Sequence, residues 1–377
     1  MGRRGGWLLP GLPQLLRGKP LEGGFALLLW VGLLSLLVFR FHRVWDALLG
    51  DLDDRLALLT LVLCLAGTWW WSFQEGRRVR REKGEIARGW ISQVWEGFRR
   101  NRMALLGLGV IVVLYLAMLL TPFLAPFEPE FREAYEVGGD LAQRLAPPSS
   151  MHPMGTDQYS QDVLSRILYG ARISLTIGFL AVAISVTLGL LLGAVAGYWG
   201  GFVDTAIMRL VDMVMAFPRL VILLAIVAFF PRTIFLVIVA LAFTQWPFTT
   251  RMIRGEILSL KEREYAEAAK ALGFSRARIL FRHLLPNALG PLIVVATLGI
   301  GNAIVLEAGL SFLGLGVQAG TPSWGSMVSD GRDYLTDAWW IATFPGLAIV
   351  AAVLAFNLVG DGVRDALDPR NSPGARR

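Results

Sequence analysis

Charged residues and cysteine are scarce in this chain of 377 residues. Asp, Glu, Lys and Arg make up 17% of it, whereas apolar types make up 55%. A soluble domain usually carries about 25% charged residues, so the composition predicts a membrane protein. Cys64, inside an apolar stretch, is the single cysteine, which excludes an intrachain disulfide and a zinc site built from cysteines.

Lysine is also rare, and its context excludes an ATP-binding phosphate loop. The four lysines are followed by Pro20, Gly84, Glu262 and Ala271, whereas such a loop requires Lys followed by Ser or Thr after a glycine-rich turn. The three histidines are far apart and fit no zinc-helix pattern. We therefore expect no enzyme activity and no catalytic residue, metal or cofactor in this chain.

Long apolar stretches are abundant, and a spanning helix needs roughly 20 such residues. Eight candidate spans cover residues 24–39, 56–73, 103–121, 173–198, 211–230, 233–250, 289–310 and 340–360. The fifth begins with charged residues and contains Pro218, so we expect a kinked or broken helix there. The sequence therefore predicts an all-α polytopic membrane protein.

Basic residues are distributed unequally between the segments that connect these spans. Segments on one side hold 25 Lys and Arg, and segments on the other side hold seven; the richer set is 1–23, 74–102, 251–288 and 361–377. Because basic segments stay in the cytoplasm, we expect a multi-pass protein of the inner or plasma membrane. Both termini and the 251–288 loop would then be cytoplasmic, and residues 128–171 would be extracytoplasmic.

Ionisable residues are missing from the centres of most predicted spans. Glu307 is expected near the outer end of its span and Arg219 near the inner end of another. Secondary transporters usually keep such groups on an ion path inside the membrane. The sequence therefore disfavours an ion-coupled carrier and indicates that the energy for any transport comes from outside the membrane.

Small residues recur every fourth position in the span at 173–198, at Ala181, Ser185, Gly189, Gly193 and Gly197. This spacing lets another helix approach closely. Two interpretations stay open: packing within the bundle of this chain, and contact with a second membrane subunit.

The loop at 255–288 predicts two short helices. Residues 264–272 are rich in Ala, Glu and Lys, which favour helix. Gly273 would end that helix and Ser275 would cap a second one. That helix would place Ala277, Leu280, Phe281 and Leu284 on one face, and Pro286 would break it before the next span.

Three functions compete for this helical hairpin. A DNA-binding unit is disfavoured because both ends join membrane spans and no third helix is present, so we expect no nucleic-acid partner. A plain connector is the simplest alternative. The third is a docking element that presents an amphipathic helix to a soluble partner.

A family resemblance favours the docking element. Glu267, Ala268, Ala269 and Gly273, followed by Leu285-Pro286, resemble the EAA loop of ABC importer permeases. RHLLPN at 282–287 is similar to the oligopeptide, dipeptide and nickel branch, as are 98–114, 155–175, 309–328 and 356–370, in the same order. Ser160 and Gln161 replace a Gly and an Arg usual in that branch.

The resemblance implies a type I ABC importer transmembrane domain, in the second permease subunit of its transporter. The expected parts are an extension with two extra spans (1–90), a first span module (95–127), an extracytoplasmic loop (128–171), the core (172–361) and a cytoplasmic tail (362–377). The implied partners are a homologous permease, two ATPase subunits that bind ATP and Mg²⁺, an extracytoplasmic solute-binding protein and membrane lipid. The alternative is a membrane scaffold or receptor that docks a soluble partner without translocation.

Overall fold

The computed structural model describes residues 57–64, 66–67, 90–128, 144–318 and 320–367, and these are almost entirely helical. No strand occurs in these ranges, apart from an isolated bridge between Thr156 and Asp162. The all-α prediction is therefore confirmed. The predicted span at 24–39, and all of 56–73 except the helical residues 57–64 and 66–67, lie outside the described residues.

The chain divides into two compact units. One comprises residues 1–89 and Leu116–Glu128; the other comprises Trp90–Tyr115 and Pro129–Arg377. In the first unit, Leu120 and Phe123 pack with Ala57 and Leu61 in a small apolar core. Phe123 belongs to the short helix α7 (Thr121–Leu124), which has a proline in its first turn.

Five helices of the described residues are long and apolar enough to span a membrane. They coincide with five of the predicted spans: α6 (Arg102–Leu119), α9 (Val163–Trp199), α12 (Ile234–Leu260), α15 (Leu285–Phe312) and α17 (Trp340–Leu367). Helix α9 begins before the apolar run because a polar cap sets its start. Asp162 accepts a 2.7 Å hydrogen bond from the Ser165 amide at the start of α9, as an N-cap residue does.

The candidate span at 211–230, predicted as kinked or broken, is a bent pair of helices. Helix α10 (Gly201–Met215) and helix α11 (Arg219–Phe229) meet at an angle of 80°. Pro218 is the N-cap of α11, with φ −57°. Because proline cannot continue a helix through its own position, the prediction of a break is confirmed.

Helices α9 and α12 pack closely along the predicted stripe of small residues. A Cβ atom on Gly189 would lie 2.5 Å from the Cβ of Thr249, and one on Gly197 would lie 2.9 Å from the carbonyl oxygen of Arg254. Gly193 lies between them and faces α12 as well. In this chain the three glycines therefore serve packing inside the bundle.

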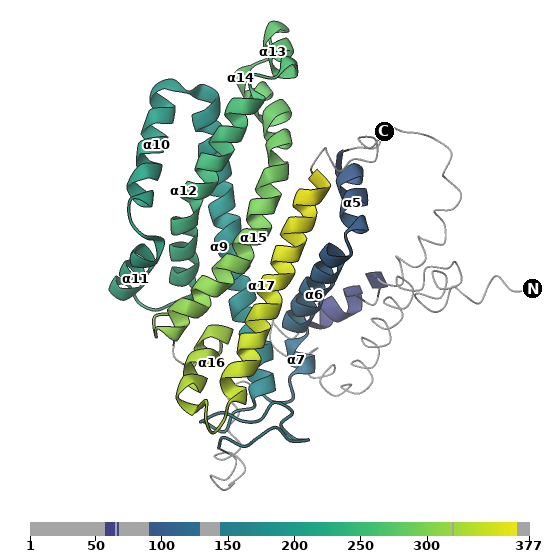
Figure 1. Ribbon diagram of the computed structural model, residues 1–377, viewed down its shortest axis with the longest axis vertical. Coiled ribbons are helices and arrows are strands. Elements are labelled where there is room, and N and C mark those ends of the chain that lie inside the picture. Colours follow the sequence, from purple (N-terminus) through teal and green to yellow (C-terminus); the bar gives the residue numbers. More distant parts are fainter. Residues whose placement is uncertain (1–56, 65, 68–89, 129–143, 319, 368–377) are drawn as a thin grey trace, which may run out of the picture. The chain divides into compact units, whose positions relative to one another are not determined.

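The shorter helices lie at the edges of the bundle. Helix α5 (Trp90–Arg100) was not predicted; it lies beside the end of α17, where a Cβ atom on Gly97 would lie 3.1 Å from Ala366. Helix α16 (Trp324–Gly331) begins with a capping box at Ser323 and is followed by the 3₁₀ turn η4 (Arg332–Tyr334). Figure 1 shows α16 at the end of the core helices that is opposite to α13 and α14.

Candidate functional sites

The loop between α12 and α15 forms the predicted helical hairpin. Helix α13 (Glu264–Ala271) is followed by α14 (Arg276–Ile279). Gly273 has φ +77°, and its amide donates to the Lys270 carbonyl (3.0 Å) while the Phe274 amide donates to the Ala269 carbonyl (3.2 Å). This pair of bonds is a Schellman motif. The Ser275 hydroxyl accepts from the Arg278 amide, as predicted for a cap.

The path from α14 into the next span differs from the prediction. The chain does not break at Pro286; α14 continues through a π-helical turn, η3 (Leu280–Leu284), into α15, which has Pro286 in its first turn. The Leu285 amide donates to the Leu280 carbonyl, five residues back. Proline is tolerated in the first turn of an α-helix, because its missing N–H has no required α-helical partner there.

The π turn also changes the buried face of the second helix. Of the predicted face, Leu280 and Leu284 are buried, but Ala277 and Phe281 are exposed, and Ile279 is buried instead. A π turn takes more residues than an α turn. Positions five apart, such as Ile279 and Leu284, therefore point the same way. The prediction from α-helical spacing was right for Leu280 and Leu284 and wrong for Ala277 and Phe281.

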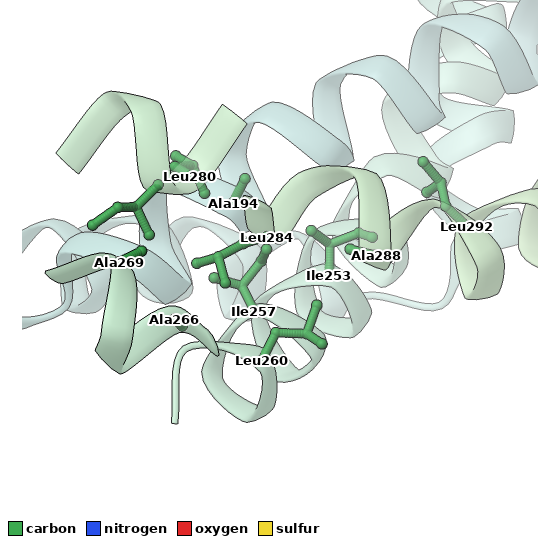
Figure 2. Close-up of a cluster of buried hydrophobic side chains, with 11 residues drawn as sticks. Ala194, Ile253, Ile257, Leu260, Ala266, Ala269, Leu280, Leu284, Ala288 and Leu292 are labelled. Carbon is green, nitrogen blue, oxygen red and sulfur yellow. The ribbon is translucent and has the colours of Figure 1, made fainter. Parts of the chain in front are cut away.

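An apolar cluster fixes the hairpin to the membrane helices (Figure 2). Its members are fully or almost fully buried and come from α9, α12, the hairpin and α15: Ala194, Ile253, Ile257, Leu260, Ala266, Ala269, Ile279, Leu280, Leu284, Ala288 and Leu292. Because three long helices contribute, a displacement of the hairpin would be transmitted to all of them.

The predicted docking residues divide between the two faces of the hairpin. Glu267, Ala268, Gly273 and Pro286 are exposed, whereas Ala269 lies in the buried cluster. Leu285 is half-buried and packs against the same cluster. The EAA segment thus combines an anchor with an outward-facing acidic side chain. Ala266, which precedes this segment, also lies in the buried cluster and was not predicted.

A cavity of about 710 Å³ opens at the break between α10 and α11. Its walls come from α10, α11, α12 and α15 and are mainly apolar; the polar side chains are Arg219, Thr244, Gln245 and Asn302. Arg219 donates to the Thr244 hydroxyl (3.2 Å) and to the Gln245 side-chain oxygen (3.3 Å).

The sequence predicts Arg219 near the inner end of its own span, and its hydrogen bonds show which parts of the neighbouring long helices it lies beside. Thr244 and Gln245 lie near the middle of α12, and Gln245 also faces Gly299, in the middle of α15. The break at Pro218 carries Arg219 to this level, and hydropathy does not reveal that displacement. An arginine therefore lies opposite the central part of the bundle.

A polar cluster at the α16 end was not predicted. The buried Arg166 pairs with Asp157 and lies 3.5 Å from Asp330. On α15, the fully buried Glu307 accepts hydrogen bonds from the hydroxyls of Ser311 (2.8 Å) and Ser174 (3.2 Å). These groups connect α9, α15 and α16, and they are separated in sequence by up to 173 positions, so no local pattern joins them.

Sequence comparisons place the chain among transport proteins. Residues 189–373 match the family described as "binding-protein-dependent transport system inner membrane component", and residues 89–148 match the N-terminal transmembrane domain of oligopeptide transport permease C. A dipeptide transport system permease of Alkalihalophilus pseudofirmus is 41% identical over 74% of this chain and 89% of its own length. A di/tripeptide permease of Pseudomonas aeruginosa is 40% identical over 74% and 92%.

Two further comparisons concern a third permease and a solved structure. A probable D,D-dipeptide permease of Escherichia coli is 42% identical over 69% of this chain and 85% of its own length. A chain of the MetNI methionine ABC transporter in an inward-facing conformation superposes with a TM-score of 0.46 and 20% identity, covering 54% of this chain and 98% of that one.

Proposed function

This chain belongs to the family of inner-membrane components of binding-protein-dependent transport systems, and we propose that the importer it serves carries peptides. It is a multi-pass inner-membrane permease of an ABC importer, and its family membership favours translocation over the scaffold alternative. The peptide solute is supported by relatives at 40–42% identity that are named for dipeptides, di/tripeptides and D,D-dipeptides.

The hairpin α13–α14 is the coupling element of this proposal. Two ATPase subunits bind ATP and Mg²⁺, and one of them receives the hairpin. The supporting observation is that the EAA segment has one buried and one exposed face: Ala269 packs against the spans, whereas Glu267 is exposed. An Arg or Lys of the ATPase would pair with the Glu267 carboxylate.

The remaining partners follow from the same transporter architecture. A homologous permease completes the translocation path, and both termini and the hairpin face the cytoplasm. The end of the bundle that carries α16 then faces outward, where the segment 144–162 and α16 would meet an extracytoplasmic solute-binding protein. The excess of basic residues on the hairpin side supports this orientation.

The coupling proposal is tested by Glu267→Lys in the complete transporter, with Glu262→Lys as the matched control. Both glutamates are exposed, and Glu262 precedes α13. We expect both variants at normal membrane levels, and we expect Glu267→Lys alone to lose ATPase co-purification or peptide uptake per ATP. Normal values of both in Glu267→Lys would show that the hairpin is not the coupling element.

The assignment of ATP hydrolysis to partner subunits has its own test. No Lys-Ser or Lys-Thr pair exists in this chain, so the purified chain should not hydrolyse ATP. Turnover by a preparation free of partner ATPases, persisting through successive purification steps, would contradict the assignment.

A further inference from the structure

Arg219 is a charged side chain opposite the middle of the bundle, and the hydrogen bonds found for its side chain are to neutral groups. Its guanidinium donates to Thr244 and Gln245. None of the ion pairs among the described residues includes Arg219. Ionisable groups within membrane spans are costly to insert, and they usually mark the path of a solute or ion.

The start of helix α11 adds a second positive feature at the same wall. Arg219 is the first residue of α11, whose N-cap Pro218 supplies no side-chain hydrogen bond and whose first turn contains no acidic residue. The N-terminus of an 11-residue helix carries a partial positive charge. The two features thus reinforce each other, and both attract an anion.

The cavity next to Arg219 is large enough for a small solute. Its volume of about 710 Å³ lies within the usual range for ligand sites, about 300–1,000 Å³. Asn302 and Gln245 provide further hydrogen-bonding groups, while Ile222, Phe248 and Leu298 are among its apolar walls. Such a site combines a positively charged group at a fixed position with apolar walls that can contact different side chains.

We propose that the cavity at the α10–α11 break binds the carboxylate of the transported solute, with Arg219 as its counter-ion. The inference rests on the proposed function, because a peptide carries a carboxylate at its C-terminus. The planar guanidinium can donate two parallel hydrogen bonds to one carboxylate. The apolar walls contact side chains without selecting one, which suits a permease whose peptides share only their backbone.

The first experiment measures uptake by the complete transporter in proteoliposomes, with the solute-binding protein at saturation. A dipeptide and its C-terminal amide are compared in the wild type, Arg219→Gln, Arg219→Lys and the control Arg232→Gln. Arg232 is exposed in the connection between α11 and α12 and does not line the cavity. Uptake is expressed per assembled transporter, so a change in membrane level does not enter the result.

We expect Arg219→Gln to lower uptake of the free-acid peptide about tenfold, because a charge-assisted hydrogen bond is lost. Arg219→Lys should retain part of the uptake, because it keeps the charge but loses the second parallel hydrogen bond, and Arg232→Gln should retain all of it. Uptake of the amide, whatever its level in the wild type, should not fall in Arg219→Gln. The binding protein is the same throughout, so its own preference for the free acid cancels between variants.

A second pair of variants covers the case in which Arg219→Gln does not assemble. Ile222 lines the cavity one helical turn after Arg219. Ile222→Glu would supply a competing carboxylate from within the chain, and Ile222→Gln is its uncharged control. We expect Ile222→Glu to take up the free-acid peptide about tenfold more slowly than Ile222→Gln, for the same loss of a charge-assisted bond.

The outcomes separate the two proposals. If the wild-type transporter carries no peptide, the proposed function fails. Suppose instead that the wild type carries peptide. If Arg219→Gln then lowers uptake of the free acid and of the amide equally, or lowers neither, and if Ile222→Glu and Ile222→Gln take up the free acid at the same rate, the proposed carboxylate site is wrong. Arg219 would then be neutralised by another group, such as a carboxylate of the second permease subunit.

Discussion

A Cβ atom on Gly193 of α9 would lie 2.5 Å from the carbonyl oxygen of Thr250 on α12. Real Cβ atoms do not approach a backbone oxygen so closely, so the two helices could not keep their present separation. Gly189 and Gly197, one turn to either side, meet α12 in the same way. The closest approach of these two long helices therefore depends on the absence of side chains at three successive turns.

Gly193→Ala should lower the stability of the permease by about 1–3 kcal/mol, since the helices must separate or strain. The matched control is Gly255→Ala on α12, where a Cβ would meet nothing within 4 Å; the control should be neutral or slightly stabilising, because alanine favours helix. The measurement is the apparent melting temperature in detergent. Equal values for the two variants would mean that the α9–α12 separation adapts freely.

Ser160→Gly should stabilise the protein. Ser160 has φ +61°, a conformation that costs a residue with a side chain roughly 1–2 kcal/mol, part of which is offset by the greater freedom of glycine in the unfolded chain. We expect a net gain of up to about 1 kcal/mol. Ser150→Gly is the control, since Ser150 is exposed and lacks a positive φ. A loss of stability in Ser160→Gly would show that its side chain contributes more than the strain costs.

Arg166→Gln should be among the most destabilising single changes outside the membrane centre. The Arg166 side chain is 6% exposed and pairs with Asp157, with Asp330 at 3.5 Å. Removing it leaves the buried Asp157 carboxylate without a counter-ion, which costs about 3–5 kcal/mol. Asp157→Asn added to Arg166→Gln should recover part of the loss. A double variant no better than the single one would contradict the assigned pairing.

Asp330 gives this cluster a pH dependence of defined sign. Burial raises the pKa of Asp330 above its usual value; Arg166 lowers it and Asp157 raises it. The folded protein therefore binds this proton more tightly than the unfolded chain. Its stability decreases as the pH rises from the ordinary aspartate pKa through the raised one.

Asp330→Asn should consequently be more stable than the wild type at neutral pH, and the difference should disappear as the pH falls toward 4. Asp333→Asn is the matched control, because the Asp333 side chain is 74% exposed. Melting temperatures of the three proteins between pH 4 and 8 provide the test. A wild type that is stabler than Asp330→Asn at neutral pH would reverse the sign and show that the Arg166 contact outweighs burial.

Local signals account for what the sequence predicted well. The uncharged run after Ile173 indicates a spanning helix, and the proline at 218 indicates a helix break, each within one element. Gly273 and Ser275 were assigned correctly for the same reason, since a C-cap and an N-cap are formed by neighbouring residues. The five spanning helices and the broken helix pair therefore follow from the apolar runs, the prolines and the glycines of the sequence.

The features that were not predicted from the sequence depend on tertiary structure. The π turn at 280–284 changes which residues face inward, although its residues look like ordinary helix. Arg219 reaches the middle of the bundle only because α10 and α11 meet at 80°. The partners of Arg166 and Glu307 come from separate elements. Each depends on angles and contacts that one-dimensional spacing does not contain.

Substitutions at Gly273 test whether coupling requires the positive φ at this turn or the absence of a side chain. The φ of Gly273 is +77°, and a Cβ there would meet nothing within 4 Å of this chain. Substitution therefore costs backbone strain without a clash. Asparagine tolerates a positive φ, alanine does so at about 1 kcal/mol or more, and valine is the least tolerant.

We expect membrane levels near wild type for all three variants, because the Gly273 site is exposed and the apolar cluster that anchors the hairpin remains. Peptide uptake per ATP should decrease in the order Gly273→Asn, Gly273→Ala, Gly273→Val as the Schellman turn becomes harder to form and α13 is re-aimed. If asparagine impairs coupling as severely as valine does, the requirement is for space, and a partner surface must approach Gly273 closely. If valine couples normally, the turn has no part in coupling.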